Sequence, residues 1–326
     1  MFDRRFALAA LAAIPLALDA LLPIHPPLAR ARSGATAEPD SLRVLDTGEG
    51  IPVVLIPGIA GGAFGFRAVA DSLQRAGYRV LTVEPLGMGG SSRPKRADYS
   101  LAAQGDRIAA ALDGRDVGDA VLVGHSVGAA IAMRIALRRP DLVRAVVAIE
   151  GGAQEAAATP GLRRAMKFAK VIKIFGSAGG LRKRIRNQLI QSSADASWVT
   201  DVLVDEYAGP VTADWRRSID VLAGMARSRE PDSLAPHLTE VECPVEIVIG
   251  EVPHSGAVPA EELARLVARI PRVAVTRVPG AGHFIQEERP GAVVAAVERA
   301  SDRITTDAPD GAMNMCVHMA PTSPAP

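Results

Sequence analysis

Short apolar runs alternate with amphipathic stretches along most of the chain from residue 42 onward. The short runs are typical of buried strands, and the stretches with apolar residues every three or four positions are typical of helices that pack on a core. Strands are predicted at residues 42–45, 53–56, 79–83, 120–123, 145–149, 245–249 and 273–278. Helices are predicted at residues 66–75, 101–112, 127–138, 260–268 and 292–300. This alternation predicts an α/β fold, with a mostly parallel, doubly wound sheet covered by helices on both faces.

The alternation is interrupted once, between residues 151 and 239, where helix-like segments dominate. We therefore expect a core formed by residues 41–150 and 240–303, with residues 151–239 inserted between two strands as a helical lid or cap. Residues 304–326 are rich in Pro, Thr, Met and Ala and have no periodicity, which predicts a disordered tail.

The first 40 residues read as a targeting segment. Arg4 and Arg5 precede an apolar stretch at residues 6–18, which has the length of a signal-peptide core and is short for a membrane span. Ala29-Arg30-Ala31 offers a cleavage site, and the paired arginines also fit a twin-arginine signal. An exported protein, periplasmic or secreted, is expected, and an uncleaved membrane anchor is the main alternative.

Composition adds few constraints. The chain has 326 residues, 48% of them hydrophobic, and can bury one large core plus an insertion. A net charge of +1 gives no overall attraction to nucleic acid, so no nucleic-acid partner is expected. The two cysteines, Cys243 and Cys316, do not form a disulfide framework or a metal-ligand spacing.

Gly124-His125-Ser126-Val127-Gly128 lies between an apolar run and a helix of small residues. In this context the G-x-S-x-G pattern predicts a nucleophile elbow, a sharp turn from strand to helix that exposes a serine hydroxyl at the end of a sheet. Alone, the pattern fits an ordinary tight βα turn as well. A second signal, His283 in a glycine-rich loop after the last predicted strand, supplies a candidate general base.

Four segments together resemble the serine hydrolases of the α/β-hydrolase superfamily. This group includes esterases and lipases that carry a helical cap. The segments are residues 55–59 (LIPGI), like the oxyanion loop, residues 84–94 (EPLGMGGSSRP), like the glycine-rich turn of the next strand, the Ser126 elbow, and Gly282-His283-Phe284. The order and placement of these motifs agree with that architecture. The chain departs from the family at Pro57, where histidine is frequent, and at Glu84, where aspartate is frequent.

The resemblance also implies a carboxylate that orients His283, and two positions are open. The usual acid loop, residues 250–256 (GEVPHSG), contains only Glu251, which falls early in it. Glu150 ends the strand that follows the elbow helix, where some family branches, haloalkane dehalogenases among them, place the acid. Because neighbouring parallel strands lie about 4.8 Å apart, Glu150 would stand one strand away from Ser126. We therefore prefer Glu150 to Glu251, and expect His254 to be a polar loop residue.

The implied chemistry is that of a serine esterase or lipase. Ser126 attacks an ester carbonyl, His283 transfers the proton, Glu150 fixes the imidazole, and the backbone N–H groups of Ile59 and Val127 bind the oxyanion. No metal or organic cofactor is required. The alternatives are a serine-dependent acyltransferase, perhydrolase or C–C hydrolase, or a catalytically silent binding protein with the same fold. Dehalogenase and epoxide hydrolase chemistry is disfavoured because it uses an aspartate where Ser126 stands.

The predicted cap contains a strongly basic segment. Between residues 161 and 190 there are nine basic and no acidic residues. The basic residues are Arg163, Arg164, Lys167, Lys170, Lys173, Arg182, Lys183, Arg184 and Arg186. Apolar residues interleave with them, so the segment fits two interpretations: a solvated helix face over the cap core, or a surface that contacts anionic lipid or an acyl carrier. An apolar cap over the site also favours a small-molecule or lipid-like ester substrate.

Overall fold

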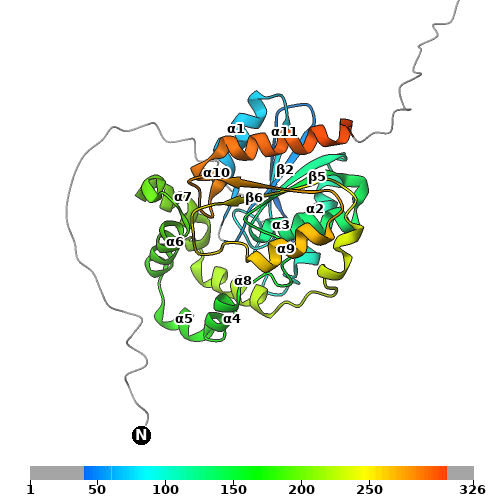
Figure 1. Cartoon of the computed structure of the whole chain (residues 1–326). Coiled ribbons are helices and arrows are strands. Elements are labelled where there is room, and N and C mark those ends of the chain that lie inside the picture. Colours follow the sequence, from blue (N-terminus) through cyan, green and yellow to red (C-terminus); the bar gives the residue numbers. More distant parts are fainter. Residues whose placement is uncertain (1–39, 60, 307–326) are drawn as a thin grey trace, which may run out of the picture. The chain divides into compact units, whose positions relative to one another are not determined.

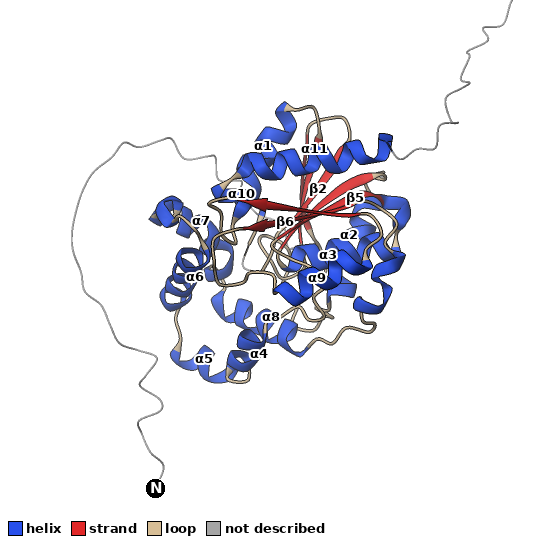
Figure 2. Cartoon of the chain, viewed as in Figure 1, coloured by secondary structure: helices blue, strands red, loops and turns tan. Residues whose placement is uncertain are grey.

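Seven strands form one sheet in the computed structural model, which describes residues 40–59 and 61–306. Every predicted strand is confirmed, with ends that differ from the prediction by at most two residues. The strands are β1 (Arg43–Thr47), β2 (Pro52–Ile56), β3 (Arg79–Glu84), β4 (Ala120–His125), β5 (Val143–Ile149), β6 (Val245–Gly250) and β7 (Val273–Val278). Their order across the sheet is β1-β3-β2-β4-β5-β6-β7. Figure 2 shows the strands in red, with helices in blue around them.

The sheet is parallel except at one edge, where β1 pairs with β3 in antiparallel orientation. From β3 to β7 all pairs are parallel, so the carboxyl ends of these strands meet at one edge of the sheet. In the central pair, His125 at the end of β4 is opposite Ile149 at the end of β5. Ser126 and Glu150, the next residues of each strand, therefore leave the sheet side by side.

Helices cover both faces of the sheet, as predicted. One face carries α1 (Arg67–Arg75) and α11 (Pro290–Thr306), and the other carries α2 (Leu101–Asp113), α3 (Val127–Arg138) and α9 (Ala260–Arg269) (Figure 1). Residues of β2 alternate between two separate hydrophobic clusters: Val53 and Leu55 pack with α1 and α11, and Val54 and Ile56 pack with α2 and α3. The period of two along a strand thus divides the apolar core into two layers.

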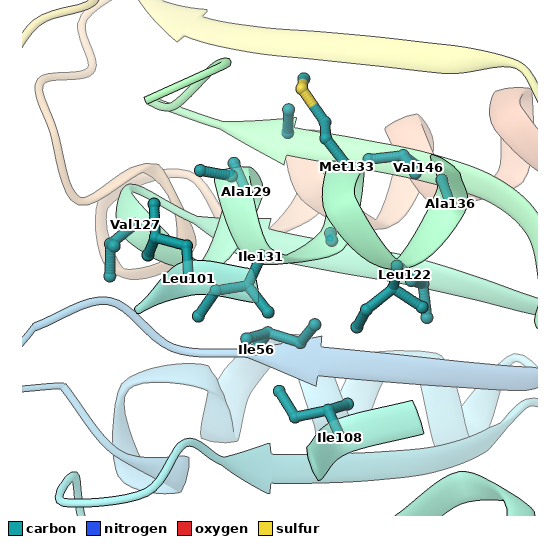
Figure 3. Packing of buried hydrophobic residues seen from close by; sticks show 14 of the residues in the cluster. Ile56, Leu101, Ile108, Leu122, Val127, Ala129, Ile131, Met133, Ala136 and Val146 are labelled. Carbon is teal, nitrogen blue, oxygen red and sulfur yellow. The ribbon is translucent and has the colours of Figure 1, made fainter. Parts of the chain in front are cut away.

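Helix α3, which begins directly after Ser126, is buried from Val127 to Ala136. Figure 3 shows Ile131 on this helix facing Ile56, with Leu122 and Ile108 in the same layer. Small residues such as Ala129 and Ala132 let the helix lie close to the sheet. Complete burial of a side chain such as Ile131 contributes about 2–3 kcal/mol, so the helix that follows the elbow is firmly held.

Five helices lie between β5 and β6 in the chain, in the region expected to form an insertion. They are α4 (Pro160–Met166), α5 (Ala169–Phe175), α6 (Ala178–Ser192), α7 (Asp201–Thr212) and α8 (Trp215–Arg227). Four of these helices, α4, α6, α7 and α8, have a side-chain cap that accepts a hydrogen bond from a free N–H group of the first turn. The capping residues are Thr159, Ser177, Thr200 and Asp214, in that order. Helices α4 and α5 pack against α8, while α6 packs against α7. We call residues 151–239 the insertion.

The structure adds detail at the carboxyl end of the core. A short helix not predicted from the sequence, α10 (Ile285–Glu288), follows the His283 loop, and α11 continues to Thr306. The predicted targeting segment and most of the predicted tail lie outside the described residues. Within residues 40–59 and 61–306, no helix has both the length and the apolar character needed to cross a bilayer.

Candidate active site

The turn at Ser126 has the geometry of a nucleophile elbow. Ser126 has φ 53° and ψ −118°, a conformation that non-glycine residues rarely adopt. Its flanking glycines are sterically required, because a β-carbon at Gly124 would lie 2.3 Å from the carbonyl oxygen of Gly128, and one at Gly128 would lie 2.2 Å from that of Ile56. The strained turn directs the serine out of the sheet, as the motif predicted.

Ser126 opens into a cavity of about 570 Å³. Its floor is formed by loops at the carboxyl ends of β2, β3, β4, β6 and β7, which is where open α/β sheets bind ligands. The insertion contributes mostly apolar residues: Leu162, Leu181, Ile185, Leu189, Tyr207, Val211, Val221, Leu222 and Met225. The cavity therefore has a polar end at the sheet, and mostly apolar walls elsewhere.

His283 lines the same cavity from the loop between β7 and α10. Its ring lies 4.7 Å, between centroids, from that of His125, and the Nε2 group of His125 donates a hydrogen bond to the carbonyl oxygen of His283 at 3.0 Å. Burial lowers the pKa of His125 to about 4. Burial, followed by the effect of His125, lowers the pKa of His283 to about 3 against the opposing effect of Glu150. Both imidazoles are therefore neutral at neutral pH, the form in which His283 can accept a proton.

Glu150 lies at the carboxyl end of β5, beside the Ser126 turn. Like Ser126 it has a positive φ, 44°, and its backbone N–H donates to Val248 while that of Ser126 donates to Ile149. Its Oε1 accepts a hydrogen bond of 2.5 Å from the backbone N–H of Gly250. One of its carboxylate oxygens forms a group with one ring nitrogen each of His254 and His283, and these three atoms lie within 4.8 Å of one another. The structure thus brings Glu150 to His283, while Glu251 is exposed at the end of β6.

His254 lies in a loop, as expected, but its side chain is buried against Glu150. Its side chain is 1% exposed, as is that of Glu150, and its Nε2 lies 3.2 Å from Oε2 of Glu150. Its Nδ1 lies 2.7 Å from the carbonyl oxygen of Val252, to which it donates a hydrogen bond. Burial alone would lower the pKa of His254, but the adjacent Glu150 carboxylate and the hydrogen bond to Val252 outweigh that effect and raise it. The loop after β6 therefore places a histidine against the candidate acid.

The insertion is bonded directly to the loop that carries His283. The backbone N–H of His283 donates to the carbonyl oxygen of Ser192, the last residue of α6, at 2.7 Å. The carboxylate of Glu288 accepts from the N–H groups of Gly282 and Ala194, one on each side of this junction. The position of the candidate base consequently depends on the insertion as well as on the sheet.

Two backbone donors stand where the family resemblance places an oxyanion site. Within the described part of the chain, neither the N–H of Ile59 nor that of Val127 has a hydrogen-bond partner. Val127 begins α3, so its N–H belongs to the free first turn of a helix. Glu84 holds the loop that carries Ile59, because its buried carboxylate accepts from the N–H groups of Ala63 and Gly90. Sequence reasoning noted Glu84 only as a departure from the family pattern.

The arrangement can support nucleophilic catalysis with its own side chains: the Ser126 hydroxyl and the neutral His283 imidazole line the cavity, the Glu150 carboxylate lies close to His283, and the N–H groups of Ile59 and Val127 are free. The spacing of Glu150, His254 and His283 would also allow three ligands to a metal ion. Two of these three groups are, however, already paired with each other at 3.2 Å. We therefore interpret the cluster as an ion pair of His254 and Glu150 next to the imidazole of His283.

Comparisons with known proteins agree with this geometry. The model of the family described as "Alpha/beta hydrolase family" matches residues 53–297. The chain is 27% identical over 241 residues to an uncharacterized hydrolase of Bacillus subtilis, covering 73% of this chain and 85% of that protein. It is also 27% identical over 275 residues to an sn-1-specific diacylglycerol lipase of Mus musculus, covering 79% of this chain and 84% of the relative.

A solved structure of an α/β-hydrolase fold protein from Burkholderia ambifaria is 26% identical, with a TM-score of 0.64, and the match covers 78% of this chain and 93% of that one. The relatives are named as hydrolases, which supports hydrolase activity here. Because the family model extends from β2 into α11 and the fold agrees throughout, the chain belongs to the α/β-hydrolase family.

Proposed function

We propose that the protein is a serine hydrolase that cleaves carboxylic esters with hydrophobic acyl groups. The observation that carries the proposal is that Ser126 and His283 line the polar end of a mostly apolar cavity, with the Glu150 carboxylate close to His283. Similarity to a protein named as a diacylglycerol lipase supports an ester substrate. The proposed catalytic residues are Ser126 as nucleophile, His283 as general base and acid, and Glu150 as the acid of the triad.

The reaction proceeds through an acyl-enzyme. The Ser126 oxygen attacks the ester carbonyl while His283 takes its proton, and the N–H groups of Ile59 and Val127 stabilise the resulting oxyanion. Collapse of the tetrahedral intermediate releases the alcohol, which receives the proton from His283. Water then attacks the acyl-enzyme with His283 again as base, the carboxylic acid leaves, and Ser126 regains its proton. Throughout, Glu150 stabilises the imidazolium form of His283.

The low pKa of His283 in the enzyme without substrate is compatible with a role as general base. The buried imidazole is neutral before the reaction, so none of the enzyme is trapped in the protonated form at neutral pH. Proton transfer then depends on Glu150, whose negative charge favours the imidazolium as it forms. The carboxylate therefore contributes most in the transition state, where the positive charge appears.

The substrate class is tested with p-nitrophenyl esters of increasing acyl length, from acetate upward. Each methylene that enters the apolar cavity is worth about 0.8 kcal/mol, so we expect kcat/KM to rise about fourfold per methylene until the cavity is filled. The Ser126→Ala variant, prepared in the same way, gives the background rate. Highest activity on the acetate, or no dependence on length, would contradict a hydrophobic acyl substrate while leaving ester hydrolysis intact.

A further inference from the structure

The outer face of α5 exposes four large apolar side chains. Phe168, just before the helix, is 63% exposed, and Val171, Ile174 and Phe175 are 51%, 70% and 84% exposed. Lys167 and Lys170 are exposed on the same side. Helix α5 packs on α8 and lies at the edge of the folded part of the chain (Figure 1). We call Lys167, Phe168, Lys170, Val171, Ile174 and Phe175 the docking face.

The charge around this face is strongly positive and largely unneutralised. Of the nine basic residues between 161 and 190, three form ion pairs: Lys173 with Asp220, Arg182 with Asp201 and Asp205, and Arg186 with Asp201. In the described chain the other six have no carboxylate partner: Arg163, Arg164, Lys167, Lys170, Lys183 and Arg184. Exposed apolar groups interleaved with unpaired cations are characteristic of helices that lie in a membrane interface.

We propose that the docking face binds the surface of an anionic lipid bilayer. The apolar side chains would enter the boundary between headgroups and acyl chains, while the lysine ammonium groups stay at the level of the lipid phosphates. A second copy of the chain fits less well, because a symmetric contact through this face would place Lys167 and Lys170 against the same charges of the partner. The bilayer accommodates both the exposed apolar area and the positive charge.

Docking would also bring lipid to the candidate active site, a point that rests on the proposed function. Leu162 of α4 and Leu181 and Ile185 of α6 line the cavity, and these two helices flank α5 in the chain. The far end of α6 bonds to the backbone of His283 through Ser192. A hydrophobic ester that leaves the bilayer at α5 would therefore meet the apolar walls of the cavity first.

Docking is tested by cosedimentation of the protein, as Ser126→Ala, with vesicles of phosphatidylcholine alone or with one third phosphatidylserine. We expect binding to the anionic vesicles that weakens as salt is raised. Lys167→Gln with Lys170→Gln should weaken it about fivefold per charge removed. Phe168→Ala with Phe175→Ala should weaken it about tenfold or more, because both rings are removed from the lipid.

Matched controls are Val202→Ala, an apolar side chain that is 72% exposed on α7, and Lys95→Gln with Arg96→Gln, two exposed cations before α2. These variants should bind as well as the parent. Equal binding to both vesicle types, no binding, or equal losses in the controls would overturn the proposal. A concentration-dependent dimer in solution that Phe168→Ala with Phe175→Ala abolishes would assign the face to a second copy instead. Because Ser126→Ala is used, failure here is independent of catalysis.

A separate observation assigns a role to His254. The Nδ1 group of His254 donates to the carbonyl oxygen of Val252 at 2.7 Å, and its Nε2 lies 3.2 Å from the Glu150 carboxylate. A negative carboxylate at this distance favours a proton on Nε2 as well, which gives an imidazolium paired electrostatically with Glu150. The titratable groups around it are Glu150, the neutral His283 and, further away, Glu288. With the N–H of Gly250 on the other carboxylate oxygen, Glu150 is held from two sides.

We infer that His254 is a positioning residue that fixes the Glu150 carboxylate toward His283. It does not line the cavity, so its loss should lower kcat and leave KM nearly unchanged. We expect His254→Ala to lower kcat on a short-chain ester about tenfold or more, since a 1 Å misplacement can cost about a hundredfold. His254→Gln, whose amide can still donate to Glu150, should restore part of the loss.

Active enzyme is counted by fluorophosphonate titration, so that unfolded protein does not enter kcat. Unchanged kcat in His254→Ala would overturn the positioning role. Equal losses of kcat in His254→Ala and His254→Gln would also overturn it, as would a change in KM without a change in kcat. If His254→Ala fails to fold, His254→Gln is tested alone: the positioning role predicts a lower kcat with KM nearly unchanged.

Discussion

Replacing Ser126 with alanine is expected to abolish ester hydrolysis. The hydroxyl of Ser126 is the only proposed nucleophile, and loss of a triad serine typically lowers kcat about a millionfold, leaving the smaller acceleration that the oxyanion donors supply. The substitution removes one oxygen from a side chain that opens into the cavity, so stability should change little. Rates on a p-nitrophenyl ester and covalent labelling by a fluorophosphonate measure the effect directly.

Ser255 provides the matched control, because it lines the same cavity from the loop after β6. Ser255→Ala should keep both labelling and turnover. If the folded wild-type protein is not labelled and hydrolyses no ester, the chain is a silent binding protein built on a hydrolase fold. Labelling that persists in Ser126→Ala would instead move the nucleophile to another residue.

Most of the core could be predicted because its signals are local. Most strands are short apolar runs, and Ser126, which joins β4 to α3, is flanked by Gly124 and Gly128, which its crowded turn requires. The antiparallel edge could not be predicted, since β1 looks like any other short strand until its pairing with β3 is known. The break in alternation predicts an insertion, but the packing of its helices depends on contacts such as α5 on α8 that no local pattern specifies.

The residues of the site also fall into those with a local sequence signal and those without one. Ser126 and His283 lie in glycine-rich turns that stand out in the sequence, and Glu150 could be proposed because adjacent strands end together. His254 was missed because its burial depends on the path of the loop after β6, where Gly256 has a φ of 92° and lies against the ring of His283. His125 was missed because only the fold brings its ring to His283, 158 residues away.

Replacing Glu150 with glutamine should lower kcat about ten thousandfold, whereas Glu251→Gln should stay within about twofold of wild type. Glutamine keeps the size of the side chain and an oxygen that can accept from Gly250, but it removes the charge that stabilises the imidazolium of His283. Glu251 is exposed, so its neutralisation changes only a solvated charge. Both variants are compared with wild type on the same ester, with active sites counted by fluorophosphonate.

Two further results would make the assignment specific to the triad. The double variant of Ser126→Ala and Glu150→Gln should be no slower than Ser126→Ala alone, because residues that act as one unit do not lose activity additively. In the Glu150→Gln background His254 has no carboxylate to position. Adding His254→Ala to Glu150→Gln should therefore lower kcat little further. Near wild-type turnover in Glu150→Gln would remove Glu150 from the triad, and a large loss in Glu251→Gln would transfer the role to the loop after β6. We expect neither result, because the Glu150 carboxylate is buried near two histidines and accepts a hydrogen bond from the N–H of Gly250.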